Sequence, residues 1–539
     1  MRTSKMDPPL SESIMRSLLK KENIEWGDFL GSIWEKKCHR FAFGASKLDG
    51  NLWGKMVDDG WEILTFMLDN THPMRPNTNN TDETSNAGNN CAISTTIGEE
   101  FPPPLLFRDL HPMDDPEEIQ QLFGTSLYAA YLAGSSIIWN HVDLISPRVA
   151  ALCEDLQQPF HFPHAYANAY LTPPLSQTVP AHADDRDVLV FQLVGRKRWK
   201  VYERIPVHHP YPHEQVGKAG MAVPESVLNG PLAFDGCLSP GDVLYLPRGM
   251  VHEAGTFYTS KPDQPPDLSF HITVALATHD WTLGGNLSRI LQTKLLEDTA
   301  TLRRSLLPAM PVVVDSKETP SNGKSDFVSC GGSLVDAKAL QEQLDSVFEN
   351  LRSQITADSI LNDMNHRIET HNKRATEKRL ALAAAAASSK KEKHETDCES
   401  NSTIALDRVV GPLAAKSITL ETVVKASTMA EKEHALQQFQ GKPGLTVRDG
   451  VGNDVAHLVA KIKFSGLIIR VEDFRADVDE FDESSLCDLT ALSLAKRAVE
   501  LGAFRIVEST SGSDNNTAAA AAAAAAMPNP KRRRTQPPL

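Results

Sequence analysis

Short apolar segments separated by glycine and proline fill the middle of the chain, from about residue 160 onward. They predict strands at 165–172, 186–194, 197–203, 242–246 and 268–276. Short strands at this spacing, with turn residues between them, are typical of an antiparallel barrel or double sheet. Helical spacing of apolar positions is found on both sides of this region, so the chain is expected to be of the α+β class.

Helices are predicted within residues 8–42, 115–128 and 146–157, with a strand and a turn in GSSIIWNHVDL between the last two. After about residue 283 the pattern becomes helical again. One apolar stripe comprises Leu287, Ile290, Leu291, Leu295 and Leu302, and a second comprises Leu340, Leu344, Phe348, Leu351 and Ile355. Such stripes pack helix against helix. They do not distinguish a partner helix in the same chain from one in a second subunit.

Changes in composition divide the chain further. We expect an N-terminal helical segment at 1–69, a main domain at 101–282, a helical region at 283–382 and a small α/β domain at 403–508. Three other stretches predict no packed core, because they are rich in polar residues or low in complexity. These are an Asn/Thr-rich disordered insertion at 70–100, a linker at 383–402 and a tail at 509–539.

The length of 539 residues is too great for one ordinary core, which agrees with two or three domains. A net charge of −14 argues against direct nucleic-acid binding by a basic surface and favours a basic partner. The seven cysteines include no CxxC pair, so a zinc finger or disulfide framework is not expected. The first residues show no secretory signal, and no segment has the roughly 20 apolar residues of a membrane span. Lys531-Arg532-Arg533-Arg534 beside prolines resembles a nuclear-import signal, although a merely basic tail has the same composition.

A metal site is predicted from His182, Asp184 and His252. Side chains two residues apart on a strand point to the same face, so His182 and Asp184 are expected to act together. His252 ends the segment GDVLYLPRGMVH, whose glycines and proline provide turns that return a strand end beside the first one. Two imidazoles and one carboxylate can bind Fe(II) and leave positions free for other ligands. The same ligand types also bind zinc.

Lys197 lies on the apolar face of its strand with Trp199 and Val201. A buried ammonium is costly unless it meets an anion, and a carboxylate co-substrate bound to the metal would be that anion. Two neighbouring strands offer polar groups to the same space. Asn168, Tyr170 and Thr172 share one face, and Ser269, His271, Thr273 and Ala275 share another. Among these, Tyr170 and Thr273 have hydroxyl groups that can donate to a carboxylate.

The three segments NAYLTPPLSQTVPAHADDRDVLVFQLVGRKRWKVY, LSPGDVLYLPRGMVHEA and SFHITVAL resemble the JmjC-type ribosomal oxygenases, which are Fe(II)- and 2-oxoglutarate-dependent protein hydroxylases. The resemblance is specific over about residues 160–280 and also includes FLGSIWEKK. It implies a double-stranded β-helix core, a helical dimerisation region and a C-terminal winged-helix domain. It further implies that His182, Asp184 and His252 hold the iron and that Lys197 pairs with the far carboxylate of 2-oxoglutarate. By the same resemblance, Asn168, Tyr170 and Thr273 line the co-substrate pocket.

Two residues depart from the family pattern. Ala183 stands where an aromatic residue is usual, and Ala275 where a serine is common; both change the pocket without removing a ligand. The resemblance predicts a homodimer that hydroxylates a histidine of a ribosomal protein or demethylates a histone lysine, and the basic cluster predicts a nuclear location. Two alternatives stand beside it. One is an inactive cupin-core scaffold in chromatin or ribosome assembly, and the other is a zinc-dependent isomerase, which gives no reason for Lys197.

Overall fold

The structure is a computed structural model. It describes residues 13–42, 52–71, 103–123, 126–160, 165–218, 220–256, 268–297, 355–392, 406–438, 468–475 and 488–507, together with Gln341, Asp345, Phe348, Glu349 and Arg352. The predicted insertion beyond Thr71 and the basic tail therefore lie outside the described residues.

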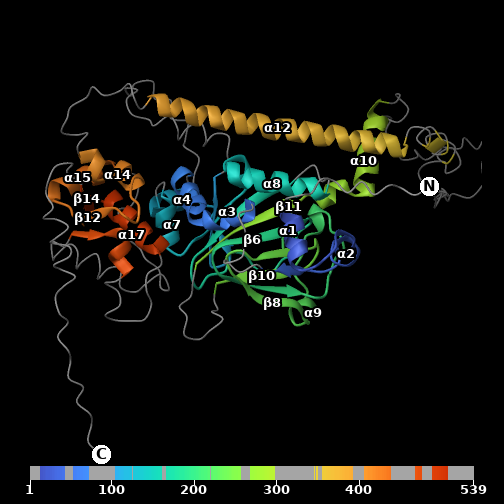
Figure 1. The fold of residues 1–539 in the computed structure, drawn as a ribbon, viewed down its shortest axis with the longest axis horizontal. Helices are drawn as coiled ribbons and strands as arrows, with labels where there is room; N and C mark the ends of the chain where they lie inside the picture. The colour runs from blue at the N-terminus through green and yellow to red at the C-terminus, as the bar shows by residue number, and fades with distance from the viewer. Residues whose placement is uncertain are drawn as a thin grey trace, which may run out of the picture.

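Two antiparallel sheets form the centre of the molecule (Figure 1). The larger sheet contains, in spatial order, β1 (His39–Phe41), β9 (Val243–Leu246), β6 (Asp187–Gly195), β11 (Ser269–Leu276), β5 (Ala165–Thr172), β4 (Ser136–Trp139), β2 (Leu105–Arg108) and β3 (His111–Pro112). The smaller sheet contains β10 (His252–Gly255), β7 (Lys197–Tyr202) and β8 (Leu232–Leu238). The five predicted strands all agree with the structure to within one residue, and β8 and β10 were not predicted.

Alternation along the strands gives the molecule two separate apolar layers. One layer lies between the two sheets and includes Val190, Trp199 and Val201. The other lies between the larger sheet and the helices, and includes Leu189 and Phe191 of β6 with Phe270 and Ile272 of β11. Residues on the inner faces thus border the space between the sheets, which is where the polar residues of β5, β7 and β11 also lie.

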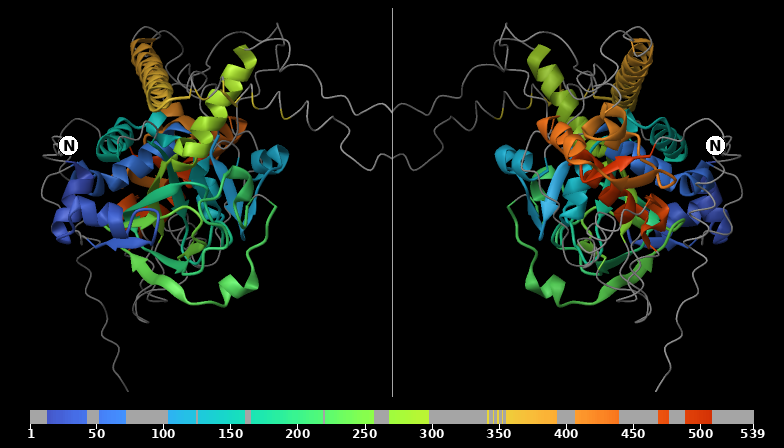
Figure 2. Two further views of the ribbon diagram at one scale, coloured as in Figure 1. Left: turned by 90° about the vertical axis from the view of Figure 1, so that its right-hand side faces the viewer. Right: turned by 90° about the vertical axis from the view of Figure 1, so that its left-hand side faces the viewer.

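The helices that cover the larger sheet come mostly from the first 160 residues. They are α1 (Ile14–Lys21), α2 (Trp26–Ser32), α3 (Leu52–Asp58), α4 (Gly60–Asn70), α6 (Pro116–Phe123), α7 (Leu127–Leu132) and α8 (Pro147–Phe160). In the left view of Figure 2 the first of these helices, in dark blue, lie on the left of the sheets, and the light-blue segment that includes α6 lies on the right. Ser13 caps α1 by accepting from the Arg16 amide, which satisfies a donor that the first helical turn leaves unpaired.

Two predictions for the N-terminal region were wrong in detail. Residues 39–41 were expected to be helical but form β1, which pairs with β9 some 200 positions away in the sequence. The reason is tertiary, because β9 presents an edge that a local pattern does not reveal. The helix expected at 115–128 is two helices, α6 and α7. Ser126 caps the second by accepting from the Ala129 amide.

A helix of 36 residues, α12 (Ala357–Glu392), follows the main domain and contacts α10 (Leu283–Glu297). It runs across the top of Figure 1 from α10 toward the C-terminal elements. Its length corrects the predicted linker at 383–402, because residues 383–392 continue the helix. Alanine, lysine and glutamate are strong helix formers, so this stretch has the propensity to remain helical without an apolar face.

The C-terminal elements form a three-stranded antiparallel sheet with helices against it. The strands are β13 (Ile468–Arg470), β12 (Val423–Ala426) and β14 (Phe504–Ile506), and the helices are α14 (Pro412–Lys416), α15 (Met429–Gln438) and α17 (Asp488–Glu500). Helix α17 is buried along its whole length and contacts α7. Lys496 of α17 pairs with Asp69 and lies 4.6 Å from the ring centroid of Tyr128, which joins the two parts of the chain.

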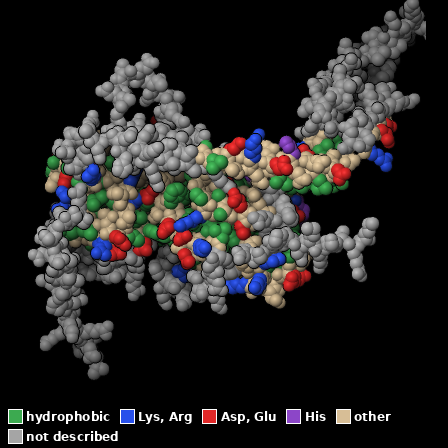
Figure 3. Space-filling model, turned by 45° about the horizontal axis from the view of Figure 1, so that its top comes forward, with side chains coloured by type: hydrophobic (Ala, Val, Ile, Leu, Met, Phe, Trp, Pro, Cys, Tyr) green, Lys and Arg blue, Asp and Glu red, His purple; other side chains and the backbone are tan. Residues whose placement is uncertain are grey.

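The described helices include none with the length and hydropathy needed to cross a bilayer. On the face shown in Figure 3, acidic and basic side chains are interspersed with apolar ones. The negative net charge is therefore not gathered into a single patch on that face.

Candidate metal centre

The backbone around His182 and His252 brings these two residues side by side. Each amide donates to the carbonyl of the other residue, at 3.1 Å from His182 and 2.9 Å from His252. This isolated bridge corrects the expectation that His182 and Asp184 lie on one strand, because β6 begins only at Asp187. The segment is held from other sides too. The Gly249 amide donates to the Asp184 carbonyl at 2.9 Å, and Gly249 takes φ +86°, a left-handed conformation that favours glycine.

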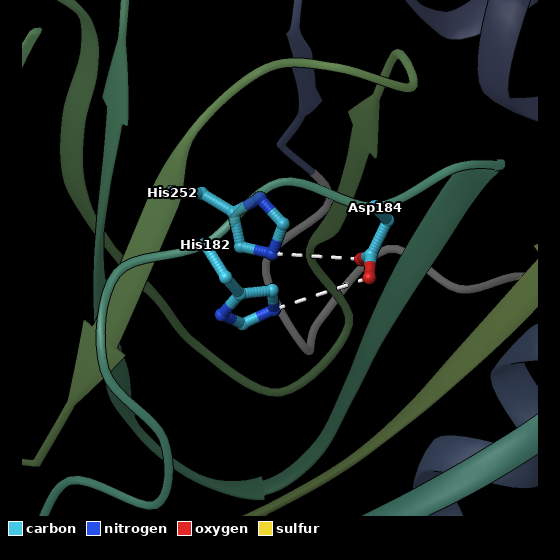
Figure 4. A group of neighbouring side chains, drawn as sticks. All are labelled: His182, Asp184 and His252. Atoms are coloured by element: carbon cyan, nitrogen blue, oxygen red, sulfur yellow. Dashed lines mark ion pairs between the residues drawn. The ribbon is translucent and has the colours of Figure 1, made fainter. Parts of the chain in front are cut away.

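His182, Asp184 and His252 meet at one point, as Figure 4 shows. One potential ligand atom from each lies within 4.8 Å of the other two. Asp184 Oδ1 is 4.0 Å from His182 Nε2, and Asp184 Oδ2 is 3.7 Å from His252 Nε2. All three side chains are largely shielded from solvent.

Both imidazoles are oriented by backbone carbonyls. His182 Nδ1 lies 2.8 Å from the Pro180 carbonyl oxygen, and His252 Nδ1 lies 3.0 Å from that of Met250. A carbonyl can only accept, so each Nδ1 carries the proton and each Nε2 keeps its lone pair toward Asp184. Histidines that bind metals have this arrangement, in which one ring nitrogen, here Nδ1, is hydrogen-bonded and the other, here Nε2, is free.

The electrostatics of the site favour neutral imidazoles beside an ionised carboxylate. Burial lowers the pKa of His182 to about 3, helped by the positive charge of Lys218 and the proximity of His252. Burial also lowers the pKa of His252. Burial alone would raise the pKa of Asp184, but the Lys218 ammonium and the two imidazoles outweigh it, and the pKa falls well below its usual value. The donor set is thus ready to receive a cation without first losing protons.

Lys197 lies on β7 and is 3% exposed. Its Nζ donates to Thr172 Oγ1 at 2.9 Å, and that hydroxyl also lies 3.0 Å from Thr178 Oγ1. Burial lowers the pKa of Lys197 to about 7. An amine in this state gains from an incoming anion, because the anion compensates the charge that burial disfavours.

All seven residues that the sequence singled out line one cavity of about 340 Å³. They are Asn168, Tyr170, His182, Asp184, Lys197, His252 and Thr273. The register explains the grouping, since Thr273 pairs with Asn168 across β5 and β11 and His271 pairs with Tyr170. The cavity therefore has a triad of potential metal ligands and, on β5, β7 and β11, a cluster of hydrogen-bond donors around a buried amine.

Three further residues of this cavity region were given no role from the sequence. His271 stacks on Tyr170 with centroids 4.9 Å apart, and its buried Nδ1 has no hydrogen-bond partner among the described residues. Thr172 accepts from Lys197, as described above. Lys218 contacts Asp184 at 2.5 Å. Strand alternation had placed His271 and Thr172 toward this space without a role, whereas no local pattern identifies Lys218, because it reaches the site from a loop.

The residues present fit a divalent transition metal. Two neutral imidazoles with free Nε2 atoms and one ionised carboxylate converge within the spacing that a single ion bridges, and no cysteine joins them. This is the donor set of mononuclear iron sites with open positions.

An antiparallel double sheet that holds two histidines and an aspartate at its cavity defines a cupin-type protein with a candidate metal centre. Residues 138–279 match the family model described as JmjC domain, so this region of the chain is similar to JmjC domains. The family resemblance expected from the sequence is thereby confirmed.

The curated relatives include proteins named bifunctional lysine-specific demethylase and histidyl-hydroxylase NO66. The protein from Drosophila mojavensis is 34% identical over 187 residues, which is 35% of this chain and 19% of that relative. The protein from Aedes aegypti is 28% identical over 242 residues, which is 43% of this chain and 35% of that relative. The chain thus spans well under half the length of these relatives.

Among solved structures, the ribosomal oxygenase YcfD from Escherichia coli is matched in several forms. The structure titled as X-ray structure of E. coli ycfD has a TM-score of 0.32 at 14% identity, over 90% of this chain and 98% of that one. A YcfD structure in complex with cobalt and 2-oxoglutarate has a TM-score of 0.30 at 14% identity, over 90% and 99% of the two chains.

Proposed function

We propose that this protein is an Fe(II)- and 2-oxoglutarate-dependent dioxygenase that hydroxylates a protein side chain. One observation carries the proposal: three potential metal ligands and a buried lysine, for which the described residues provide no carboxylate partner, line the same cavity. A dicarboxylic acid can contact both, with one end at the metal and the other at Lys197. A zinc-dependent isomerase gives no reason for the buried amine of Lys197.

In this proposal His182, Asp184 and His252 hold the iron, which when bound supplies the activation of O₂ that side chains cannot perform. Lys197 neutralises the far carboxylate of 2-oxoglutarate, and Thr172 keeps the ammonium oriented toward it through the 2.9 Å hydrogen bond. Tyr170, Asn168 and Thr273 line the wall beside this carboxylate. These groups position the co-substrate and exclude water from the buried end of the cavity.

For the target we propose a histidine of a ribosomal protein, with demethylation of a histone lysine as the second activity. The name of the NO66 relatives includes both activities. Such targets lie in basic segments, which an acidic enzyme of net charge −14 attracts over long range. The targets and the basic tail together support a nuclear location.

We further propose the domain roles implied by the family. Residues 283–382 would form the dimerisation region, for which the exposed Leu361 of α12, at 54%, offers an apolar contact. The C-terminal elements from 403 to 508 would be a winged-helix-like domain, supported by the three-stranded sheet with helices against it.

The test is turnover of the full chain, loaded with Fe(II) without oxygen and then exposed to O₂ and 2-oxoglutarate. We expect succinate release that is lost in His182→Ala and in Asp184→Ala, measured by NMR. Mass spectrometry of ribosomal proteins and histones from cells with and without the gene would find the target, as one added oxygen or the loss of a methyl group. Metal binding without succinate release on any of these proteins would favour the inactive scaffold.

A further inference from the structure

The loop at residues 215–218 brings a lysine onto the aspartate of the triad. Lys218 Nζ lies 2.5 Å from Asp184 Oδ1, the oxygen on the side of His182. Asp184 Oδ2 is the oxygen nearer His252, at 3.7 Å, and no lysine or arginine of the described residues pairs with it. The two carboxylate oxygens are therefore unequal before any metal arrives.

This contact is built into the backbone. The Ala183 amide donates to the Val216 carbonyl at 2.8 Å, so the loop is hydrogen-bonded directly to the residue between His182 and Asp184. Gly217 then takes φ +81°, and a Cβ there would lie 2.5 Å from the Ala181 carbonyl oxygen and 2.8 Å from His182 Cα. Only glycine permits this approach, which brings the next residue, Lys218, over the carboxylate.

The small side chain of Ala183 belongs to the same arrangement. It is 1% exposed and packs in a cluster with Val216 and Val251, beneath the loop. The residue that departs from the family pattern thus contacts the segment that positions Lys218.

We propose that Lys218 is a positioning residue that holds Asp184 as a single-oxygen ligand of the metal. With Oδ1 occupied by the ammonium, only Oδ2 is available beside the two Nε2 atoms. Three protein donor atoms leave about three positions of an octahedral ion open, whereas a carboxylate bound through both oxygens would leave about two. A co-substrate that chelates the metal and O₂ together need three positions. This inference rests on the proposed function, because it concerns the same metal.

The test uses Mn²⁺ as the probe and counts its bound water molecules by proton relaxation, without co-substrate and without turnover. In the unaltered protein we expect about three exchangeable waters on a 1:1 ion. In Lys218→Met the second oxygen is free to bind, so we expect about two waters and tighter Mn²⁺ binding. Lys218→Arg retains an N–H donor for Oδ1 and should restore the count to about three.

The matched control is Lys200→Met, which removes a lysine that pairs with Glu253 on the outer side of the smaller sheet. It should leave the water count unchanged. A Lys218→Met protein that keeps three waters would overturn the proposal; if its Mn²⁺ affinity rises at the same time, the lysine merely competes with the metal. Loss of Mn²⁺ binding in Lys218→Met would overturn it as well. If the unaltered protein shows no Mn²⁺ binding that is lost in His182→Ala, the proposed metal centre is wrong. Failure of the proposed function is therefore distinguishable from failure of the inference about Lys218.

Discussion

Replacement of Lys197 by methionine tests the buried amine most directly. The side chain is 3% exposed, and burial lowers its pKa from the usual 10.5 to about 7. In the unfolded chain the amine binds a proton up to about pH 10.5, whereas in the folded protein it releases the proton above about 7. The wild-type protein therefore pays a charging penalty of about 4 kcal/mol at pH 7, and this penalty falls to about 2 kcal/mol at pH 9.

The sign of the pH dependence follows from proton counts. Between pH 7 and 10.5 the unfolded state binds more protons than the native state, so this group makes stability rise with pH across that window. Below about pH 7 both states are protonated and the full penalty persists. Lys197→Met removes the titrating group and keeps a side chain of similar length in the apolar surroundings. We expect it to be more stable than wild type at pH 7, with a difference that shrinks by about 2 kcal/mol at pH 9.

Urea unfolding at pH 7 and pH 9 measures this difference, with Lys200→Met as the control on the outer face of the same strand. The control should change stability by less than about 0.5 kcal/mol at either pH. Isothermal titration supplies the second readout, because Lys197→Met should lose at least about 100-fold in 2-oxoglutarate affinity. Wild-type affinity should also weaken above pH 7, where the free protein has lost the proton that the carboxylate requires. A Lys197→Met protein that is less stable than wild type by the same amount at both pH values would refute the reasoning.

Three other changes have defined outcomes. Gly217→Ala should cost about 1–3 kcal/mol more than Gly220→Ala in urea unfolding, because both take positive φ but only Gly217 has atoms within 4 Å of the added carbon; equal costs would mean that the loop yields freely. Asp69→Asn leaves the Lys496 ammonium without its charge partner and should lower stability by about 1–2 kcal/mol, an effect that a Lys496→Met background should reduce. Thr172→Val removes the hydroxyl that accepts from Lys197 and should weaken 2-oxoglutarate binding about three- to tenfold, by titration, with Mn²⁺ affinity unchanged.

The strands of the core were predictable because each satisfies a local rule. In β7, buried and partly exposed side chains alternate from Lys197 to Lys200, as the period of two requires. The continuation of α12 to Glu392 was missed because polar, alanine-rich sequence is typical of linkers and of exposed helices alike. Strand β1 was missed because its three residues pair with an edge whose position depends on the whole sheet.

In the candidate site, too, local patterns predicted the residues and tertiary contacts decided how they meet. His182, Asp184 and His252 were expected to share a metal, and the structure brings their ligand atoms within 4.8 Å of one another. It does so through a bridge between the loop before β6 and the first residue of β10, and not along one strand. Their role as ligands stays a prediction, as do the roles of Lys197 and its neighbours.

The sequence by itself determined the residue types of the site and the alternation that turns Lys197, Tyr170 and Thr273 inward, since both are properties of short segments. Only the tertiary structure decided that all of these side chains border one cavity and that Lys218 lies on Asp184. The physical reason is that neither arrangement follows from a periodic pattern in the sequence. Lys218 arrives from a loop whose path is determined by a glycine packed against the backbone of His182, and that packing exists only once the two sheets have closed.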